Sequence, residues 1–215
     1  MHDKATSVPC HGRDIRILPG IAQVDADAPN VMRGEETQLV GAIADDGFTG
    51  LVCMPGTHCK WVSVENGRVK NFATFMTGDL FSVISNHSIL MHAVEKGSPP
   101  LGDDPTFRAA VASVREAPAT ALSSLFSIRA AQLLGFQTRE QGVPHLSGLL
   151  IGAEIAAARS LYGEPGEIVL VGSSTLGRLY QAVLAEAGYC VRVADADEAV
   201  RNGLARAAAR LWIKD

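Results

Sequence analysis

A Pro-Gly turn joins two apolar runs in the stretch Val52-Cys53-Met54-Pro55-Gly56-Thr57-His58-Cys59-Lys60-Trp61. The run before the turn is typical of a buried strand, and the run that begins at Trp61 alternates with the period of a second strand. Because glycine has no Cβ, backbone N–H groups and the threonine hydroxyl can approach a phosphate at this turn. An ordinary hairpin loop is the alternative, since glycine is common in hairpin turns.

The segments on both sides of this turn extend the same sheet. Asn66-Gly67 is a strong hairpin signal and predicts that a strand at 61–65 pairs with one at 68–75. Further along, strands at 168–171 and 190–193 alternate with helices, which requires right-handed crossovers. We expect other helices at 35–43, 80–94, 107–114, 122–134, 147–162, 176–187 and 197–209, and a short strand from Ile15 that ends at Pro19-Gly20. The pattern predicts an α/β fold with a mixed sheet and helices on both faces.

Composition narrows the functional classes. Hydrophobic residues make up 47% and charged residues 20% of the 215 residues, which is typical of a globular protein. The net charge is −4 without a Lys/Arg cluster, so nucleic acid is not an expected partner. No apolar stretch approaches ~18 residues, so we expect no membrane span. Cys53, Cys59 and His58 lack a fourth ligand at metal spacing, so we predict reduced thiols and no metal site there.

Three other motifs accompany the Pro-Gly turn. They are Met32-Arg33-Gly34-Glu35-Glu36-Thr37-Gln38-Leu39-Val40-Gly41, Thr74-Phe75-Met76-Thr77-Gly78-Asp79-Leu80-Phe81 and Ile168-Val169-Leu170-Val171-Gly172-Ser173-Ser174-Thr175-Leu176-Gly177-Arg178-Leu179-Tyr180. Together these motifs resemble the 2-dehydro-3-deoxygalactonokinases, which are sugar-acid kinases of the actin-like ATPase superfamily. The resemblance runs from about Arg13 to the C-terminus. Asp79 departs from it, because glutamate is expected at that position.

The resemblance implies a division of the chain. Residues 47–215 would form a ribonuclease-H-like nucleotide-side domain with a helical insertion around 80–146, and residues 1–46 would be a remnant of the sugar-side domain. Members of this family open with an Asp-Trp-Gly-Thr-Thr-like phosphate loop, which has no counterpart before Arg33, and residues 1–10 show no strand pattern. We therefore expect the C-terminal two-thirds of a kinase, in which Ile15, Ile17 and Leu39 lack their usual sheet partners.

The resemblance also implies an activity. It is the ATP-dependent phosphorylation of 2-dehydro-3-deoxy-D-galactonate at the 6-hydroxyl, in the cytoplasm, with magnesium as a second cofactor. The expected partners are the sugar acid and ATP, and a homodimer is a possible assembly. One alternative is a truncated, non-catalytic nucleotide-binding remnant. Another is a sugar-responsive regulator on the same fold, although the sequence contains no helix-turn-helix or basic helix to support it.

The sugar-side candidates follow Met32. Actin-like kinases carry their base just after a glycine at a helix start, and Gly34-Glu35-Glu36-Thr37-Gln38 resembles the Gly-Asp-Gln-Gln motif of related sugar kinases. Glu35 is therefore the expected catalytic base, with Glu36 beside it in substrate binding. Both could instead be helix-start carboxylates that the dipole favours. Arg33 is suited to bind the substrate carboxylate, unless it forms a structural salt bridge.

The nucleotide-side candidates lie at two turns. The resemblance assigns Gly56, Thr57 and His58 to the β- and γ-phosphates of ATP. It assigns Gly172, Ser173 and Ser174 to the adenosine, at the start of a helix whose N–H groups favour anions; an ordinary Gly-Ser N-cap is the alternative. Lys60 is expected on the surface, opposite Trp61. The acid that would hold the waters of magnesium is expected in the first phosphate loop.

Overall fold

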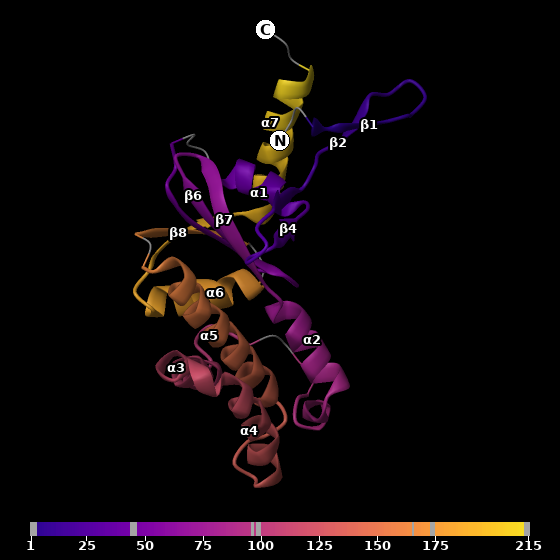
Figure 1. Ribbon diagram of the computed structural model, residues 1–215. Helices are drawn as coiled ribbons and strands as arrows, with labels where there is room; N and C mark the ends of the chain where they lie inside the picture. The colour runs from indigo at the N-terminus through magenta and orange to yellow at the C-terminus, as the bar shows by residue number, and fades with distance from the viewer. Residues whose placement is uncertain are drawn as a thin grey trace.

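A mixed five-stranded sheet forms the centre of the computed structural model, which describes residues 4–43, 47–95, 97, 100–164, 166–172 and 175–212 (Figure 1). Its strand order is β7-β6-β5-β8-β9. The strands are β5 (Gly50–Met54), β6 (Cys59–Glu65), β7 (Arg68–Phe75), β8 (Glu167–Val171) and β9 (Cys190–Ala194). The first three are antiparallel, whereas β8 pairs in parallel with β5 and β9 pairs in parallel with β8. The predicted α/β fold and mixed sheet are confirmed.

Local sequence explains the sheet. Strands β5 and β8 form its parallel centre and are almost continuously apolar, as strands buried on both faces are. The predicted hairpin between β6 and β7 is present, with Asn66 at φ 50° and Gly67 at φ 70°. An Asn-Gly pair adopts these left-handed angles readily, so the turn fixes the pairing of the two strands.

Three helices cover one face of the sheet. They are α3 (Pro105–Glu116), α5 (Gly142–Tyr162) and α6 (Thr175–Glu186). The core that they share with the sheet includes Trp61, Phe107, Ile151 and Tyr180. Helix α5 begins five residues earlier than predicted and includes Pro144. A helix can contain this proline because it lies in the first turn, where proline costs no intrahelical hydrogen bond.

Helices α1 (Glu35–Ala42) and α7 (Ala196–Trp212) cover the opposite face, in the upper part of Figure 1. Their backbones touch: a Cβ on Gly41 would lie 1.8 Å from the Ala199 carbonyl oxygen, and one on Gly203 would lie 2.0 Å from that of Thr37. The expectation that Leu39 lacks partners is wrong, because its side chain is 3% exposed in the core beneath these helices. Helix α7 supplies the cover that the local sequence of α1 does not predict.

The N-terminal residues form two small hairpins. Strand β1 (Thr6–Val8) pairs with β2 (Ile15–Ile17), and β3 (Ile21–Gln23) pairs with β4 (Asn30–Met32). The strand from Ile15 is confirmed, but the expectation of no strand in residues 1–10 is wrong, because backbone pairing with β2 makes a strand of the polar residues of β1. Ile15 and Ile17 belong to β2 and are exposed.

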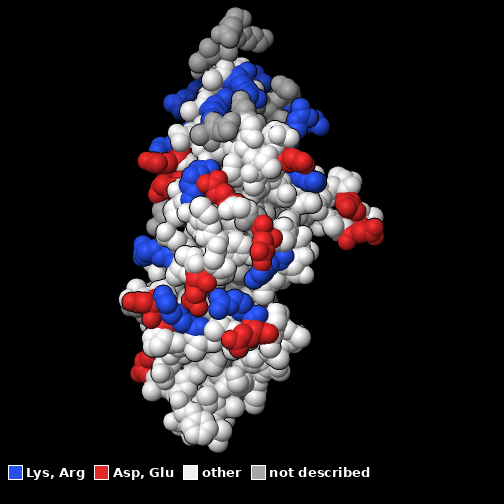
Figure 2. Space-filling view, turned by 90° about the vertical axis from the view of Figure 1, so that its left-hand side faces the viewer, with Lys and Arg blue, Asp and Glu red and all other residues white. Residues whose placement is uncertain are grey.

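The remaining helices lie at the lower end of the molecule in Figure 1. They are α2 (Thr77–His87), the short 3₁₀ segments η2 (Ile89–His92) and η3 (Pro118–Thr120), and α4 (Ala121–Leu133). The single helix expected at 80–94 is split at Ser88, whose hydroxyl accepts the Leu90 N–H at 3.1 Å. Charged side chains lie on the upper and middle parts of the face shown in Figure 2, and the lower tip of that face carries almost none. Among the described helices, none is both long and apolar enough to cross a bilayer.

Candidate functional site

The turn between β5 and β6, Gly56-Thr57, is held from behind by the start of α2. A Cβ on Gly78 would lie 2.6 Å from the Gly56 carbonyl oxygen and 2.8 Å from the Thr57 Cα, so the two segments are in backbone contact. The Asp79 N–H donates to the Thr57 carbonyl at 3.0 Å. A Cβ on Gly56, by contrast, would meet no atom within 4 Å. The turn is therefore fixed on one side and open on the other.

His58 follows the turn and is half exposed. Its Nε2 lies 3.9 Å from Asp79 Oδ2, and both side chains face solvent. At this distance the contact is weak, because both side chains are exposed to water. The His58 imidazole and the Asp79 carboxylate therefore remain accessible to an anion or a metal ion that binds at the turn.

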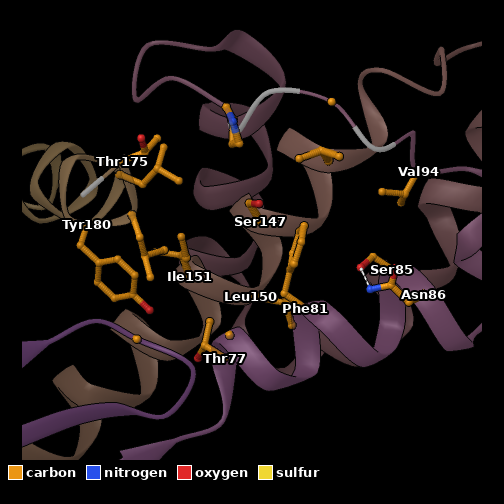
Figure 3. Close-up of a pocket in the computed structure, with 17 residues that line it drawn as sticks. Thr77, Phe81, Ser85, Asn86, Val94, Ser147, Leu150, Ile151, Thr175 and Tyr180 are labelled. Atoms are coloured by element: carbon orange, nitrogen blue, oxygen red, sulfur yellow. Dashed lines mark hydrogen bonds between the residues drawn. The ribbon is translucent and has the colours of Figure 1, made fainter.

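A cavity of about 430 Å³ opens beside Gly56 and runs between α2, α5 and α6 (Figure 3). Its walls are mainly apolar and include Phe81, Leu150, Ile151 and Leu179. Polar side chains are few. Ser85 and Asn86 lie at one end of the cavity, and Thr175 and Tyr180 lie at the other (Figure 3). An apolar slot of this size with a few polar groups is typical of a small-molecule or cofactor site.

The second predicted nucleotide turn follows β8. The Gly172 N–H donates to the Ala194 carbonyl at 3.0 Å, and a Cβ on Gly177 would lie 2.9 Å from the Gly172 carbonyl oxygen. Gly172, at the end of β8, is thus in close contact with Gly177 on α6. Ser173 and Ser174 lie outside the described residues, and Thr175, the first residue of α6, lines the cavity.

The two acids at the start of α1 have different surroundings. Glu35 Oε2 accepts the Arg33 N–H at 3.0 Å, and its Oε1 lies 3.2 Å from Lys60 Nζ on β6. Glu36 is 2% exposed; its Oε2 accepts the Gly34 N–H at 2.6 Å and its Oε1 accepts the Thr37 hydroxyl at 3.4 Å. Glu35 therefore points to the central sheet, whereas Glu36 turns back onto its own loop.

Lys60 is buried, so the expectation that it lies on the surface is wrong. Its exposed fraction is 4%, and besides Glu35 it contacts the His58 carbonyl oxygen at 3.4 Å. The face of the β6–β7 hairpin opposite Trp61 is covered by the N-terminal segment: the Thr74 hydroxyl, for example, donates to Asn30 Oδ1 at 2.6 Å. Lys60 thus links the predicted base to the predicted phosphate turn.

Arg33 is exposed beside Glu35. Both side chains line a shallow pocket of about 410 Å³ together with Gln38 on α1 and Leu204 on α7. The structure therefore brings Arg33 and Glu35 to one surface, while Gly56 and the start of α6 at Thr175 line the cavity between α2, α5 and α6.

Glu154 on α5 is a buried acid that sequence reasoning missed. It is 3% exposed and accepts hydrogen bonds from Trp61 Nε1 at 2.7 Å, from the Tyr180 hydroxyl at 2.6 Å and from the Thr77 hydroxyl. Burial raises the pKa of the Glu154 carboxyl group, and the hydrogen bonds from Thr77, Tyr180 and Trp61 act against that rise. A charged residue on the apolar stripe of a long helix was the available signal.

The four cysteines form no disulfide bond. All four are free; Cys53 and Cys59 are buried, whereas Cys10 and Cys190 are exposed. In the part of the chain that the structure describes, no group of three or more His, Cys, Asp or Glu side chains is arranged to hold a metal ion. Burial is the main reason that the pKa of the Cys59 thiol rises to about 12.

Comparison with known proteins finds a family model and relatives that are named as the same kind of kinase. The family model described as 2-keto-3-deoxy-galactonokinase matches residues 1–207. A curated protein of Rhizobium meliloti (strain 1021), named as a probable 2-dehydro-3-deoxygalactonokinase, is 51% identical over 210 residues, which cover 97% of this chain and 69% of that protein. The 2-dehydro-3-deoxygalactonokinase of Escherichia coli (strain K12) is 39% identical over 203 residues, which cover 94% of this chain and 66% of that protein.

A solved structure is similar throughout the chain. A crystal structure of a Sinorhizobium meliloti protein, described as belonging to the same kind of kinase, has a TM-score of 0.93 and 50% sequence identity. The match covers 98% of this chain and 70% of that one. The chain thus spans about two-thirds of the length of the relatives that it matches.

Proposed function

Because this chain belongs to the 2-keto-3-deoxy-galactonokinase family, whose members are carbohydrate kinases, we propose that it phosphorylates 2-dehydro-3-deoxy-D-galactonate at the 6-hydroxyl with ATP. The observation that carries this proposal is the position of Lys60. Its Nζ lies 3.2 Å from Glu35 Oε1 and 3.4 Å from the His58 carbonyl oxygen. One buried side chain therefore spans the candidate base and the candidate phosphate turn, the two groups that phosphoryl transfer needs close together.

ATP is assigned to the cavity between α2, α5 and α6. The apolar walls suit the adenosine, and the open side of the turn at Gly56, Thr57 and His58 suits the phosphates. Gly172, Ser173 and Ser174 are the residues proposed to contact the adenosine, although the two serines lie outside the described residues. Two helices start beside this cavity, α2 at Thr77 and α6 at Thr175. Helix N-termini favour anions, because their free N–H groups and dipoles point outwards.

Glu35 is assigned as the base. As the 6-hydroxyl oxygen attacks the γ-phosphorus, the hydroxyl proton passes to Glu35, a new O–P bond forms, and the bond from the γ-phosphorus to the β–γ bridging oxygen breaks to release ADP. Lys60 and the Arg33 N–H each hold one oxygen of the Glu35 carboxylate. The exposed Arg33 guanidinium would pair with the substrate carboxylate. Glu36 contributes to substrate binding by holding the Gly34 turn from behind.

Magnesium fits this site as an ion that ATP brings with it. Asp79, beside the turn and partly exposed, offers one carboxylate, and Mg²⁺ commonly binds through one or two carboxylates, waters and substrate phosphates. When bound, the ion would neutralise charge on the β- and γ-phosphates. Asp79 would hold a water of that ion.

The assignment extends to the organisation of the chain. Residues 47–215 are proposed to form a ribonuclease-H-like nucleotide-side domain with an insertion around 80–146, and residues 1–46 to belong to the sugar side. Strand order β7-β6-β5-β8-β9 with helices on both faces supports this layout. A cytoplasmic location and a homodimer accompany the proposal.

The test combines binding and turnover on the purified chain. Calorimetry with magnesium-ATP should show binding, and ADP release should depend on added 2-dehydro-3-deoxy-D-galactonate. Glu35→Gln should lower turnover by ~10²–10⁴-fold and leave ATP affinity unchanged, because glutamine keeps the shape but cannot accept the proton. Glu65→Gln, at the exposed end of β6, is the matched control and should behave as the wild type.

The outcomes separate the proposal from its alternative. ATP binding without turnover would favour a non-catalytic nucleotide-binding protein. Absence of ATP binding would refute the assignment of the cavity. Full turnover in Glu35→Gln would refute the assignment of the base.

A further inference from the structure

A chain of buried hydrogen bonds leads from Glu154 on α5 to the turn at Gly56. The Tyr180 hydroxyl donates to Glu154 Oε2 at 2.6 Å and lies 3.1 Å from Cys59 Sγ. Cys59 Sγ in turn lies 3.4 Å from the Gly56 nitrogen and 3.3 Å from the Gly56 carbonyl oxygen. The side chains of Glu154, Tyr180 and Cys59 are all buried.

The acceptor capacity of Glu154 fixes the direction of these bonds. The indole N–H of Trp61 and the hydroxyls of Thr77 and Tyr180 all donate to the two oxygens of Glu154. The single phenolic proton of Tyr180 is used by Glu154, so the Tyr180 hydroxyl can meet Cys59 only as an acceptor. The one thiol proton of Cys59 lies within reach of both this hydroxyl and the Gly56 carbonyl oxygen, to which the sulfur donates at 3.3 Å. The same sulfur accepts the Gly56 N–H at 3.4 Å, so Cys59 contacts both polar groups of Gly56.

We propose that Glu154 is a positioning residue for the phosphate turn, which it orients through Tyr180 and Cys59. The chain of bonds sets the Gly56 peptide and thereby leaves the other N–H groups of the turn to face the phosphates. It also joins α6, which carries Tyr180, to the start of α2, which carries Thr77. The adenosine side and the phosphate side of the cavity are thus held in one arrangement. Its consequence for binding rests on the proposed function.

Glu154→Gln keeps the volume of the side chain but changes which groups donate in this series of hydrogen bonds. Glutamine has one acceptor oxygen, which Trp61 requires because an indole N–H can only donate. The amide N–H₂ then faces the hydroxyls of Thr77 and Tyr180, so the phenolic proton must turn to the sulfur of Cys59. A second variant, Cys59→Ala, removes the sulfur from this series of hydrogen bonds. It is a small change, so it provides the test if Glu154→Gln does not fold.

The matched control is Tyr162→Phe. Tyr162 is also on α5, is partly buried, and donates its hydroxyl to the Trp61 carbonyl at 3.1 Å. It has no bond to Glu154, Cys59 or Gly56 among the hydrogen bonds of the described residues. Loss of this hydroxyl therefore reports what a partly buried tyrosine hydroxyl contributes to stability, apart from the turn.

Two measurements on the purified chain test the proposal. Hydrogen exchange at the Gly56 amide should be faster in Glu154→Gln and Cys59→Ala than in the wild type, and unchanged in Tyr162→Phe. Calorimetry should show magnesium-ATP affinity about tenfold weaker in the first two variants, while affinity for adenosine changes by less than about twofold, because only ATP uses the turn.

Each outcome decides a separate point. Unchanged exchange at Gly56 in both variants would overturn the positioning role of Glu154. Equal losses of ATP and adenosine affinity would also overturn it, since the effect would then be a general loss of structure. If the wild type itself binds no magnesium-ATP, the proposed nucleotide site fails, whereas the exchange comparison still decides whether Glu154 holds the turn.

Discussion

Lys60→Met removes a buried charge and keeps most of the side-chain volume, so its effect measures the ion pair with Glu35. The two charged atoms are 3.2 Å apart; Lys60 is almost fully buried, but the Glu35 side chain is 28% exposed. Removing one partner of a fully buried pair costs ~3–5 kcal/mol. Because water can solvate the remaining Glu35 in part, we expect a loss of about 1–3 kcal/mol in the free energy of unfolding.

A double-mutant cycle isolates this pair from other effects of the substitution. In the background of Glu35→Gln the ammonium of Lys60 is already unpaired, so Lys60→Met should then be close to neutral or stabilising. Urea unfolding followed by tryptophan fluorescence gives the four free energies. We expect a coupling energy of at least about 1 kcal/mol.

The exposed pair Lys70–Glu65 is the internal control, because its charged atoms are also 3.2 Å apart while both side chains are more than half exposed. The corresponding cycle with Lys70→Met and Glu65→Gln should give a coupling below about 0.5 kcal/mol. If the Lys60–Glu35 coupling is as small as that of the surface pair, burial does not strengthen the interaction and Lys60 does not fix the position of the candidate base.

Two further predictions concern the turn and the thiols. Gly78→Ala should weaken magnesium-ATP binding, because its Cβ would lie 2.6 Å from the Gly56 carbonyl oxygen. The control is Gly166→Ala, where a Cβ meets no atom within 4 Å, and it should bind ATP as the wild type does. Equal calorimetric affinities for the two variants would contradict the reasoning. Two of the four thiols should react quickly with a disulfide reagent at pH 8, namely Cys10 and Cys190, and the other two only after unfolding. Burial raises the pKa of Cys59 to about 12 and that of Cys53 well above its usual value, so a third fast thiol in the folded protein would refute the buried placement.

The sheet could be predicted from the sequence because its signals are local. Alternation within β6, the Asn66-Gly67 turn and the apolar run of β8 each depend on residues close together in the chain. The turn at Gly56 and the start of α6 were found in the same way. Their relative placement around the cavity follows from the crossover rule and the strand order.

The burial of Lys60 and Glu154, which the sequence did not predict, depends on segments far away in the chain. Lys60 was expected in solvent because alternation shows only that it lies opposite Trp61; its burial comes from the N-terminal segment, which lies over that face of the hairpin. Glu154 lies in a helix where an isolated charge could have been exposed, and its three donors come from β6, α2 and α6. No local pattern contains such partners, so only the tertiary structure shows them.

The contact between α1 and α7 has a consequence for the synthesis of the chain. Helix α1 ends at Ala42 and its partner begins at Ala196, so the backbone crossing at Gly41 and Gly203 forms only after about 150 further residues have been added. At roughly 5–20 residues per second this interval lasts on the order of ten seconds or more. During that time Leu39 has no cover from α7, and the loop that carries Glu35 is not yet placed. Helix α7, made long after α1, therefore completes the packing around the segment that carries Glu35.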